Sequence, residues 1–290
     1  MEIPLPYGLY HNNLVTIEEV ASGLSCRCYC PACKAKLIAR KGISIVHHFA
    51  HQASIDCFKG VEAGLHRLCM EIIAKEKRIN LPSLLFGKSQ QYEVFPETEI
   101  TVDNIKLEYM EAESLVPDII IESNGQPLLI EITANHRVSP EKKELLIGRN
   151  IAGIEIHVKE TLKDLFEIND YRLVNRAFRK ELLTNTTSKH WIYNPVLDKI
   201  ESSLRNDHAQ IRQIGSFTGE GGTFSYVEDC PLENRVWQGG AKKGKVYACA
   251  DECYQCDFCI ARQKNPEAVS CVGHFTVNEF QQLLQKLKDS

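Results

Sequence analysis

The chain has no long apolar run, because nowhere in its 290 residues do about 18 apolar residues follow one another. Residues 1–6 also lack the basic segment followed by an apolar one that a secretory signal needs. With 43% hydrophobic and 25% charged residues, the composition is that of a globular protein with one ordinary core and appendages. We therefore expect a cytoplasmic protein that makes no use of a membrane.

Excess positive charge is also missing, since the net charge is -4. This excludes a protein that coats nucleic acid through bulk charge, so any such contact must come from local patches. Two basic segments are candidates, and Trp237 in the second could stack on an unpaired base. The alternative is that both are solvated surfaces. The candidates are Arg172, Arg176, Arg179, Lys180 and Lys189 in the first segment, and Arg235, Lys242, Lys243 and Lys245 in the second.

Cysteine is nearly missing from the middle of the chain, although the chain contains twelve. Apart from Cys69, the cysteines lie in two groups near the ends, where two-residue spacings, histidines and turn residues indicate metal ligands rather than disulfides. No internal repeat or low-complexity tract divides the chain otherwise. We therefore expect three parts: an N-terminal zinc-finger module over 1–58, a cysteine-poor domain over 59–200, and a cysteine-rich module over 201–290.

Within the first cysteine group, the thiols of Cys30 and Cys33 are separated by two residues, and so are the imidazoles of His48 and His51. Two thiolates and two imidazoles form a complete tetrahedral set for structural zinc. The histidine spacing is shorter than in the common finger, so other residues of the segment could replace one ligand. These alternatives are His47, Cys26, Cys28 and Cys57.

The second group has six thiols where four would suffice. A ribbon-like zinc site would take its ligands from separate knuckles, and we predict Cys230, Cys253, Cys256 and Cys271. The alternative is an iron–sulfur cluster, because the close spacings of Cys249, Cys253, Cys256 and Cys259 also occur around such clusters. A segment with so little core of its own needs a metal of some kind to fold.

The middle part has an α/β pattern. Apolar residues in 61–73 recur at helical spacing, and strands are expected over 92–102, 116–122, 127–133 and 153–158. A second helix should begin after Ser139, because proline follows at the first helical position. The expected order is helix, three strands, helix, strand, and an amphipathic helix over 277–287 should close the chain.

A hairpin in this part brings two acids together. Asn124-Gly125 is a strong signal for a two-residue turn, and such a turn places Asp118 directly opposite Glu131. Like charges at opposed positions repel, and a divalent cation such as Mg²⁺ or Mn²⁺ would relieve the repulsion. Thr133 points to the same face as Glu131. A solvated sheet face or another register is the alternative, but the apolar runs on both strands favour a covered sheet and hence a site.

Further polar residues lie where they could assist such a site. Glu62 and His66 share one face of the first helix, where they could support a metal or contact a phosphate. His136 and Lys142 follow the third strand and are candidates for positive charge at a scissile phosphate. Surface positions on a helix or loop are the alternative for all four residues.

These residues resemble the PD-(D/E)xK, or restriction-endonuclease-like, nuclease superfamily, and within it the competence protein CoiA-like family. Cys30-Pro31-Ala32-Cys33, then 47–51 with three histidines, then a helix with Glu and His, resembles the CoiA-like zinc finger ahead of a nuclease. Asp118 after a proline, and Glu131-x-Thr133 after a short hairpin, stand where the superfamily has its acids and lysine.

The resemblance implies a nuclease fold and cleavage of DNA phosphodiester bonds with Mg²⁺ or Mn²⁺, in DNA uptake, recombination or defence. Asp118 and Glu131 would be metal ligands, with Glu62 as a third acid. One departure matters, because Thr133 replaces the motif lysine and another cation, such as Lys142 or Lys143, must take its role. The rival hypotheses are an inactive zinc-dependent nucleic-acid-binding protein and a redox-sensing iron–sulfur protein.

Overall fold

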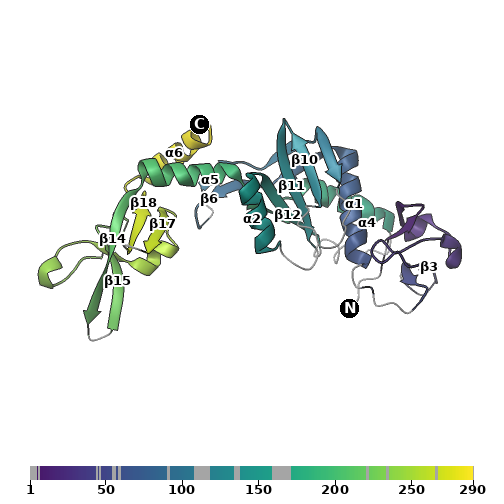
Figure 1. Ribbon diagram of the computed structural model, residues 1–290, viewed down its shortest axis with the longest axis horizontal. Coiled ribbons are helices and arrows are strands. Elements are labelled where there is room, and N and C mark those ends of the chain that lie inside the picture. Colours follow the sequence, from purple (N-terminus) through teal and green to yellow (C-terminus); the bar gives the residue numbers. More distant parts are fainter. Residues whose placement is uncertain are drawn as a thin grey trace. The chain divides into compact units, whose positions relative to one another are not determined.

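The protein forms two compact units, which are described separately. One unit comprises Met1–Pro82 and Glu97–Tyr193, and the other Ser83–Pro96 and Asn194–Ser290. The N-terminal module and most of the central domain belong to the first unit, and the C-terminal module belongs to the second. The computed structural model describes residues 5, 7–43, 45, 47–53, 57, 60–89, 92–107, 118–133, 138–158, 171–219, 222–232, 235–264 and 267–289, without the side chains of 61, 62, 107 and 171–175 (Figure 1).

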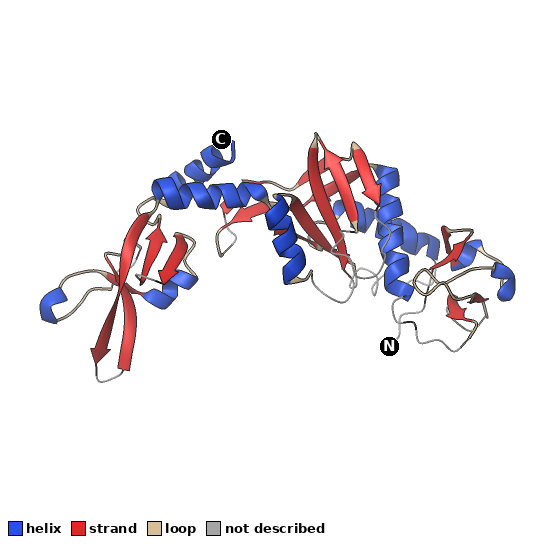
Figure 2. Ribbon diagram, in the orientation of Figure 1, coloured by secondary structure: helices blue, strands red, loops and turns tan. Residues whose placement is uncertain are grey.

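A five-stranded sheet is the centre of the first unit (Figure 2). Its order is β13-β12-β11-β10-β9, and β11 and β12 run parallel while the other neighbours are antiparallel. The parallel pair requires a crossover, which contains helix α2. The strands are β9 (Asn104–Leu107), β10 (Ile119–Ser123), β11 (Gln126–Thr133), β12 (Ala152–His157) and β13 (Lys189–Tyr193).

The β10–β11 hairpin has the predicted register. Asn124 and Gly125 have positive φ values of 51° and 73°, as a two-residue turn of this kind requires. Ser123 therefore pairs with Gln126, and Ile119 with Ile130. One step further along the same ladder, Asp118 stands opposite Glu131.

Helices cover both faces of this sheet. On one face, Leu65 and Ile73 of α1 (Gly60–Glu76) and Phe178 of α4 (Tyr171–Thr184) form one core with Ile130 and Ile154. On the other face, Leu146 of α2 (Pro140–Arg149) forms a smaller core with Leu129 and Tyr193. Ser139 caps α2 as predicted, because its hydroxyl accepts a hydrogen bond from the backbone of Lys142 at 3.4 Å. Burial on both sides explains why these strands are apolar on both faces.

The strand expected over 92–102 is wrong, because the chain bends at Pro96 and the two halves join different units. β7 (Tyr92–Phe95) pairs with β6 (Leu84–Phe86) in the second unit, and β8 (Thr98–Thr101) pairs with β5 (Arg78–Leu81) in the first. The strand beside β10 in the central sheet is β9 instead. Proline cannot donate to a strand ladder, which makes Pro96 a natural break between the two pairings.

The N-terminal module consists of two hairpins and two helical turns. β1 (Tyr7–Tyr10) pairs with β2 (Asn13–Thr16), and β3 (Leu37–Arg40) pairs with β4 (His48–His51). The turns η1 (Ile17–Glu19) and η2 (Leu24–Cys26) lie between the hairpins. A small core holds the module together and includes Leu5, Ile17, Cys26, Cys28, Leu37 and Phe49.

The second unit is built on another five-stranded sheet, with order β16-β15-β14-β18-β17. Phe280 of the closing helix contacts the rings of Phe86, Tyr92 and Phe258 at centroid distances of 5.0–5.9 Å, so the excursion of 83–96 is anchored by aromatic packing. No helix in the described part of the chain is long and apolar enough to cross a membrane. The elements are α5 (Pro195–Ser203), η3 (Leu204–His208), β14 (Gln210–Gly219), β15 (Gly222–Glu228), η4 (Gly240–Lys242), β16 (Tyr247–Cys249), η5 (Ala250–Tyr254), β17 (Cys259–Lys264), β18 (Glu267–Cys271) and α6 (Val277–Asp289).

Candidate functional site: a buried acid pair and a Cys/His cluster

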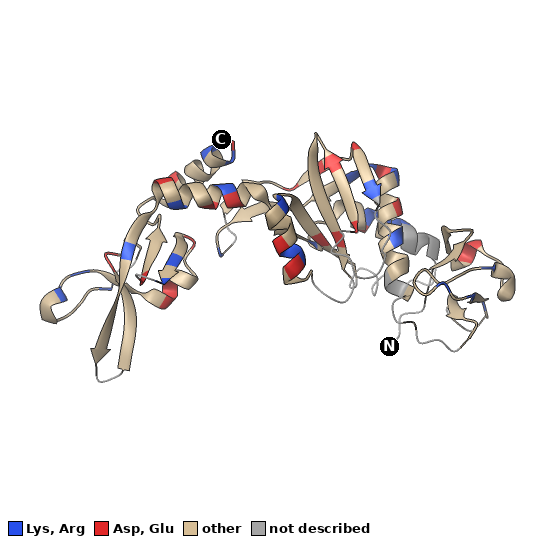
Figure 3. Cartoon of the chain, in the orientation of Figure 1, with Lys and Arg blue, Asp and Glu red and all other residues tan. Residues whose placement is uncertain are grey.

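Two carboxylates are buried where β10 begins and β11 approaches its end. The exposed fraction is 7% for Asp118 and 5% for Glu131. Asp118 Oδ2 accepts a hydrogen bond of 2.7 Å from the backbone N–H of Ile132, whereas Glu131 Oε1 is buried without a hydrogen-bond partner among the described residues. Figure 3 shows acidic residues at this end of the central sheet. Such an orphaned oxygen is costly unless a cation occupies the site.

The pKa of Glu131 is raised to about 7. Burial is the main cause and the charge of Asp118 adds to it, while the Lys142 ammonium opposes both. Near neutral pH, Glu131 therefore holds its proton more readily than an ordinary glutamate does. A carboxylate in this state is stabilised as an anion when a further positive charge approaches.

Asp118 behaves in the opposite way, although the two acids share one environment. Burial alone would raise its pKa, but a hydrogen bond and the charge of His66, with help from the Ile132 N–H and Lys142, lower it. The ring of His66 lies 3.4 Å from Asp118 Oδ1. The pair is therefore electrostatically asymmetric: Asp118 stays ionised while Glu131 titrates.

A lysine reaches the pair from helix α2. Lys142 Nζ lies 2.5 Å from Glu131 Oε2. The sequence indicates Lys142 as a possible source of positive charge after the third strand, and the structure brings it to Glu131. Lys143, its neighbour, is exposed.

Two further polar residues, Glu155 and His157, lie beside the acid pair on the neighbouring strand, and they were not predicted from the sequence. Glu155 on β12 is the register partner of Glu131, and His157 is the partner of Thr133. Thr133 Oγ1 lies 3.1 Å from His157 Nδ1, and His157 Nε2 lies 2.9 Å from a Glu155 oxygen. The alternation of polar and apolar residues in 153–157 is the signal that could have revealed Glu155 and His157.

Two of the predicted site residues cannot be placed. The side chain of Glu62 and the whole of His136 lie outside the described residues. His66 does face Asp118, and Thr133 lies beside the acid pair but bonds to His157.

A second group of ligands lies in the N-terminal module. The ligand atoms of Cys30, Cys33, His51 and Cys57 all lie within 4.8 Å of one another, so these four residues could hold a metal ion. Cys30 Sγ is 3.8 Å from Cys57 Sγ, and Cys33 Sγ is 3.4 Å from His51 Nε2. Three thiols and one imidazole are a usual donor set for structural zinc.

The candidate cluster does not include the predicted ligand His48, and it includes Cys57, which was one of the alternatives. His48 and His51 are three residues apart on β4, so their side chains point to opposite faces of the hairpin. Cys57 lies just ahead of α1, and the start of that helix passes beside Cys30. Of the other three alternatives, Cys26 and Cys28 are core thiols that donate to backbone carbonyl oxygens, and His47 Nδ1 lies 2.7 Å from a carboxylate oxygen of Glu18.

The local chemistry fits a metal. Burial raises the pKa of Cys30 to about 12, with Cys57 adding to the shift, so a buried thiolate here needs a cation. Gly60 allows the close packing, because a Cβ atom at this position would lie 3.2 Å from Cys30 Sγ and 3.8 Å from Cys57 Sγ.

The C-terminal thiols are drawn together less tightly. A hydrogen bond with Cys259, burial and the charges of Cys256 and Cys230 raise the pKa of Cys253, and burial together with Cys230 and Cys259 raises that of Cys271. Among the described residues, only the N-terminal group brings its Cys and His ligand atoms all within 4.8 Å of one another. Neither the predicted zinc set nor the iron–sulfur set is among the groups of described residues that could hold a metal ion, so the iron–sulfur alternative is unsupported and the second zinc set stays a prediction.

Three of the candidate cations for nucleic acid form ion pairs within the protein. Arg179 pairs with Glu76, Arg235 with Glu252, and Lys242 with Glu228. Arg176, Lys180 and Lys243 are exposed, and stay candidates.

Two further residues of these segments have structural roles. Lys189 is 2% exposed and donates to the carbonyl oxygens of Asn80 and Leu183, so it is a core residue rather than part of a basic surface. Trp237 packs on Tyr247 and Tyr226 at centroid distances of 4.5 and 5.1 Å, which accounts for its ring without a nucleic-acid base.

Together, the fold and the site define an α/β protein with two features. A Cys₃His cluster lies in its N-terminal module, and a buried acid pair on β10 and β11 of its central sheet is contacted by a lysine. Residues 12–59, which contain the cluster, match the family model described as Competence protein CoiA, N-terminal domain. This match confirms the CoiA-like resemblance over that segment. No curated protein and no solved structure matches the chain.

Proposed function

We propose that the protein is a metal-dependent nuclease that hydrolyses DNA phosphodiester bonds. The observation that carries this proposal is the buried pair of Asp118 and Glu131. Glu131 Oε1 has no hydrogen-bond partner among the described residues, and Glu131 Oε2 lies 2.5 Å from the ammonium of Lys142. A purely structural carboxylate pair would be expected to have its buried oxygens satisfied by protein donors. The order α1, β9, β10, β11, α2, β12 supports a restriction-endonuclease-like core around this pair.

In this proposal Asp118 and Glu131 hold Mg²⁺ or Mn²⁺, because hard cations prefer carboxylate oxygens. The bound ion would neutralise phosphate charge and lower the pKa of water. His66 positions Asp118 and keeps it ionised. Lys142 places a positive charge where a scissile phosphate would approach Glu131.

A structural role is proposed for the cysteine groups. The Cys30, Cys33, His51 and Cys57 cluster binds zinc and fixes the N-terminal module, and the C-terminal set of Cys230, Cys253, Cys256 and Cys271 binds a second zinc ion. Both sites lack an open ligand position for catalysis, as is usual for structural zinc.

The test is a cleavage assay with the full chain and Mg²⁺ or Mn²⁺ on linear, circular and single-stranded DNA and on RNA. Glu131→Gln should abolish cleavage, whereas the matched Glu122→Gln on β10, an exposed glutamate in the same hairpin, should leave it unchanged. Cleavage that survives Glu131→Gln would refute the assignment of the site.

The matched model describes a competence protein, which favours a role in DNA uptake or recombination. Destruction of foreign DNA in a defence system is the other role that a nuclease of this kind could have.

A second candidate function is a non-catalytic, zinc-dependent nucleic-acid-binding protein. It is favoured by Thr133, which replaces the motif lysine and whose hydroxyl lies 3.1 Å from His157 Nδ1. Binding of DNA without cleavage under every metal condition would support this alternative.

A further inference from the structure

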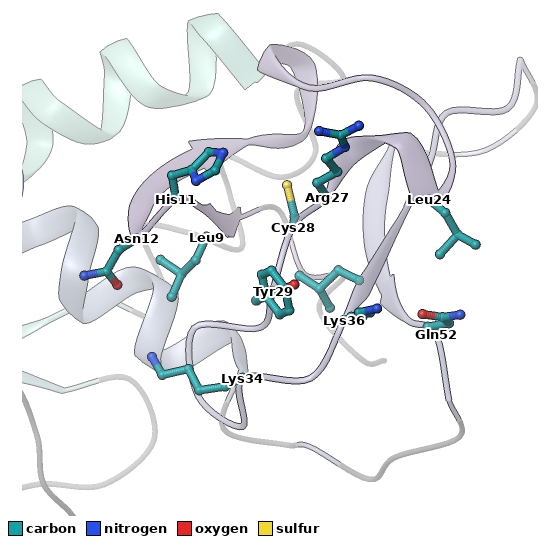
Figure 4. Close-up of a pocket in the computed structure, with 11 residues that line it drawn as sticks. Leu9, His11, Asn12, Leu24, Arg27, Cys28, Tyr29, Lys34, Lys36 and Gln52 are labelled. Atoms are coloured by element: carbon teal, nitrogen blue, oxygen red, sulfur yellow. The ribbon is translucent and has the colours of Figure 1, made fainter.

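The N-terminal module contains a cavity of about 580 Å³ that is lined by cations and has no Asp or Glu in its described lining (Figure 4). Arg27, Lys34 and Lys36 contribute the positive charge, and all three are exposed. In the described part of the chain, none of the three has a carboxylate within ion-pair distance, and Lys34 Nζ donates to the carbonyl oxygen of Pro31 at 2.7 Å. Their charge is therefore available to an anionic ligand, unlike that of Arg179, Arg235 or Lys242.

The cavity also has a flat apolar surface beside these cations. Tyr29 is 43% exposed, and its ring lies in the middle of the lining in Figure 4, near Lys36. Leu24 is 55% exposed and lines the same cavity. Half-exposed aromatic rings next to cations are the surfaces on which unpaired bases stack.

The backbone holds this lining in place. Tyr29 exchanges two hydrogen bonds with Leu9, at 2.8 and 2.9 Å. Arg27 and Lys34 have positive φ values of 51° and 60°, and their N–H groups bond to Leu24 and Cys30 respectively. Lys34 directly follows Cys33 of the candidate metal cluster, so the turn that carries Cys33 also carries one of the three cations.

We propose that this cavity binds one nucleotide of a single-stranded nucleic acid. The base stacks on Tyr29, and the flanking phosphates contact Arg27, Lys34 and Lys36. The volume suits one nucleotide. A paired base cannot enter such a cavity, so duplex DNA binds more weakly. The inference rests on the proposed function only in taking a nucleic acid as the ligand, since binding here does not require cleavage.

The test measures fluorescence anisotropy of a labelled oligothymidylate with the full chain, without added Mg²⁺ or Mn²⁺. Oligouridylate and a duplex of matched length distinguish RNA from DNA and single from double strands. Tyr29→Ala should weaken single-strand binding by about tenfold, whereas Tyr29→Phe, which keeps the ring, should not. Lys36→Glu should weaken binding and reduce the slope of log K against log salt by about 0.7 or more, because a phosphate contact is lost.

Arg40→Glu is the matched control, since Arg40 is exposed on β3 of the same module but lies outside the cavity lining. Equal loss in Arg40→Glu and Lys36→Glu would mean diffuse charge and would overturn the proposal, as would tighter binding to the duplex or unchanged affinity in Tyr29→Ala. The two proposals fail separately. If the wild-type chain never cleaves nucleic acid but the cavity variants lose binding, only the nuclease proposal is refuted. If the chain cleaves with metal but the cavity variants bind as tightly as the wild type, only the cavity proposal is refuted.

Discussion

Lys142 on helix α2 contacts Glu131 on strand β11, with the ammonium 2.5 Å from Oε2. In the nuclease superfamily that we propose for this domain, a lysine two residues beyond the acid would supply this charge, and here Thr133 stands at that position. Lys142 on α2 therefore places beside Glu131 the positive charge that Thr133 on β11 lacks.

Lys142→Ala should lower the rate of DNA cleavage by about 10²–10³-fold, because a preorganised charge near the reacting phosphate is removed. Lys143→Ala is the control, since Lys143 is the exposed neighbour on the same helix. The measurement is single-turnover cleavage of labelled DNA. Equal effects of the two substitutions would show that Lys142 has no special role.

Binding of Mg²⁺ should strengthen as the pH rises through about 7, the raised pKa of Glu131, and should level off above it. The cation binds the carboxylate, and protonation of Glu131 at lower pH competes with it. In Lys142→Ala the pKa of Glu131 should rise further, because Lys142 lowers it, so the inflection should move to higher pH. Calorimetric titration of Mg²⁺ at several pH values checks both points, and a flat profile would contradict them.

Cys57→Ala should reduce the zinc content of the purified chain by about one ion, because a closed structural site requires four ligands. Its melting temperature should fall as well. His48→Ala should retain the zinc, because His48 is not among the four ligands. Elemental analysis of both variants decides between the two ligand sets, and the reverse result would restore the Cys₂His₂ arrangement.

Gly60→Ala should destabilise the N-terminal module and weaken its metal, since the new Cβ would lie 3.2 Å from Cys30 Sγ. Gly148→Ala, at an α2 position with nothing within 4 Å of the added atom, should instead stabilise the chain by up to about 1 kcal/mol through helix propensity. Thermal unfolding compares the two. A stabilising Gly60→Ala would show that this close approach is not needed.

Lys189 should make the chain more stable as the pH rises from about 8 towards 10.5. Burial lowers its pKa to about 8, against 10.5 for an ordinary lysine, while Glu97 and Glu181 oppose the shift. In this window the unfolded chain binds more protons than the folded one, so the free energy of unfolding increases with pH. Urea unfolding of wild type and Lys189→Met should show a smaller increase in the variant, and identical pH dependence would contradict the assignment.

The sequence by itself determined the features that depend on neighbours along the chain. Asn124-Gly125 between two apolar runs set the turn and its register, and with it the opposition of Asp118 and Glu131. Ser139 ahead of a proline set the start of α2, because capping is a local interaction. Closely spaced cysteines likewise identified Cys30 and Cys33 as members of the candidate metal cluster.

The tertiary structure decided which distant groups meet. Cys57 rather than His48 joins the candidate metal ligands, because the direction of a strand face and the path into α1 are properties of the assembled module. Lys142 reaches Glu131, and Lys189 is buried, because helix and strand packing fix where long side chains end. The departure of 83–96 to the second unit follows from aromatic contacts with Phe280, far along the chain. Such pairings depend on packing between segments, which local spacing does not encode.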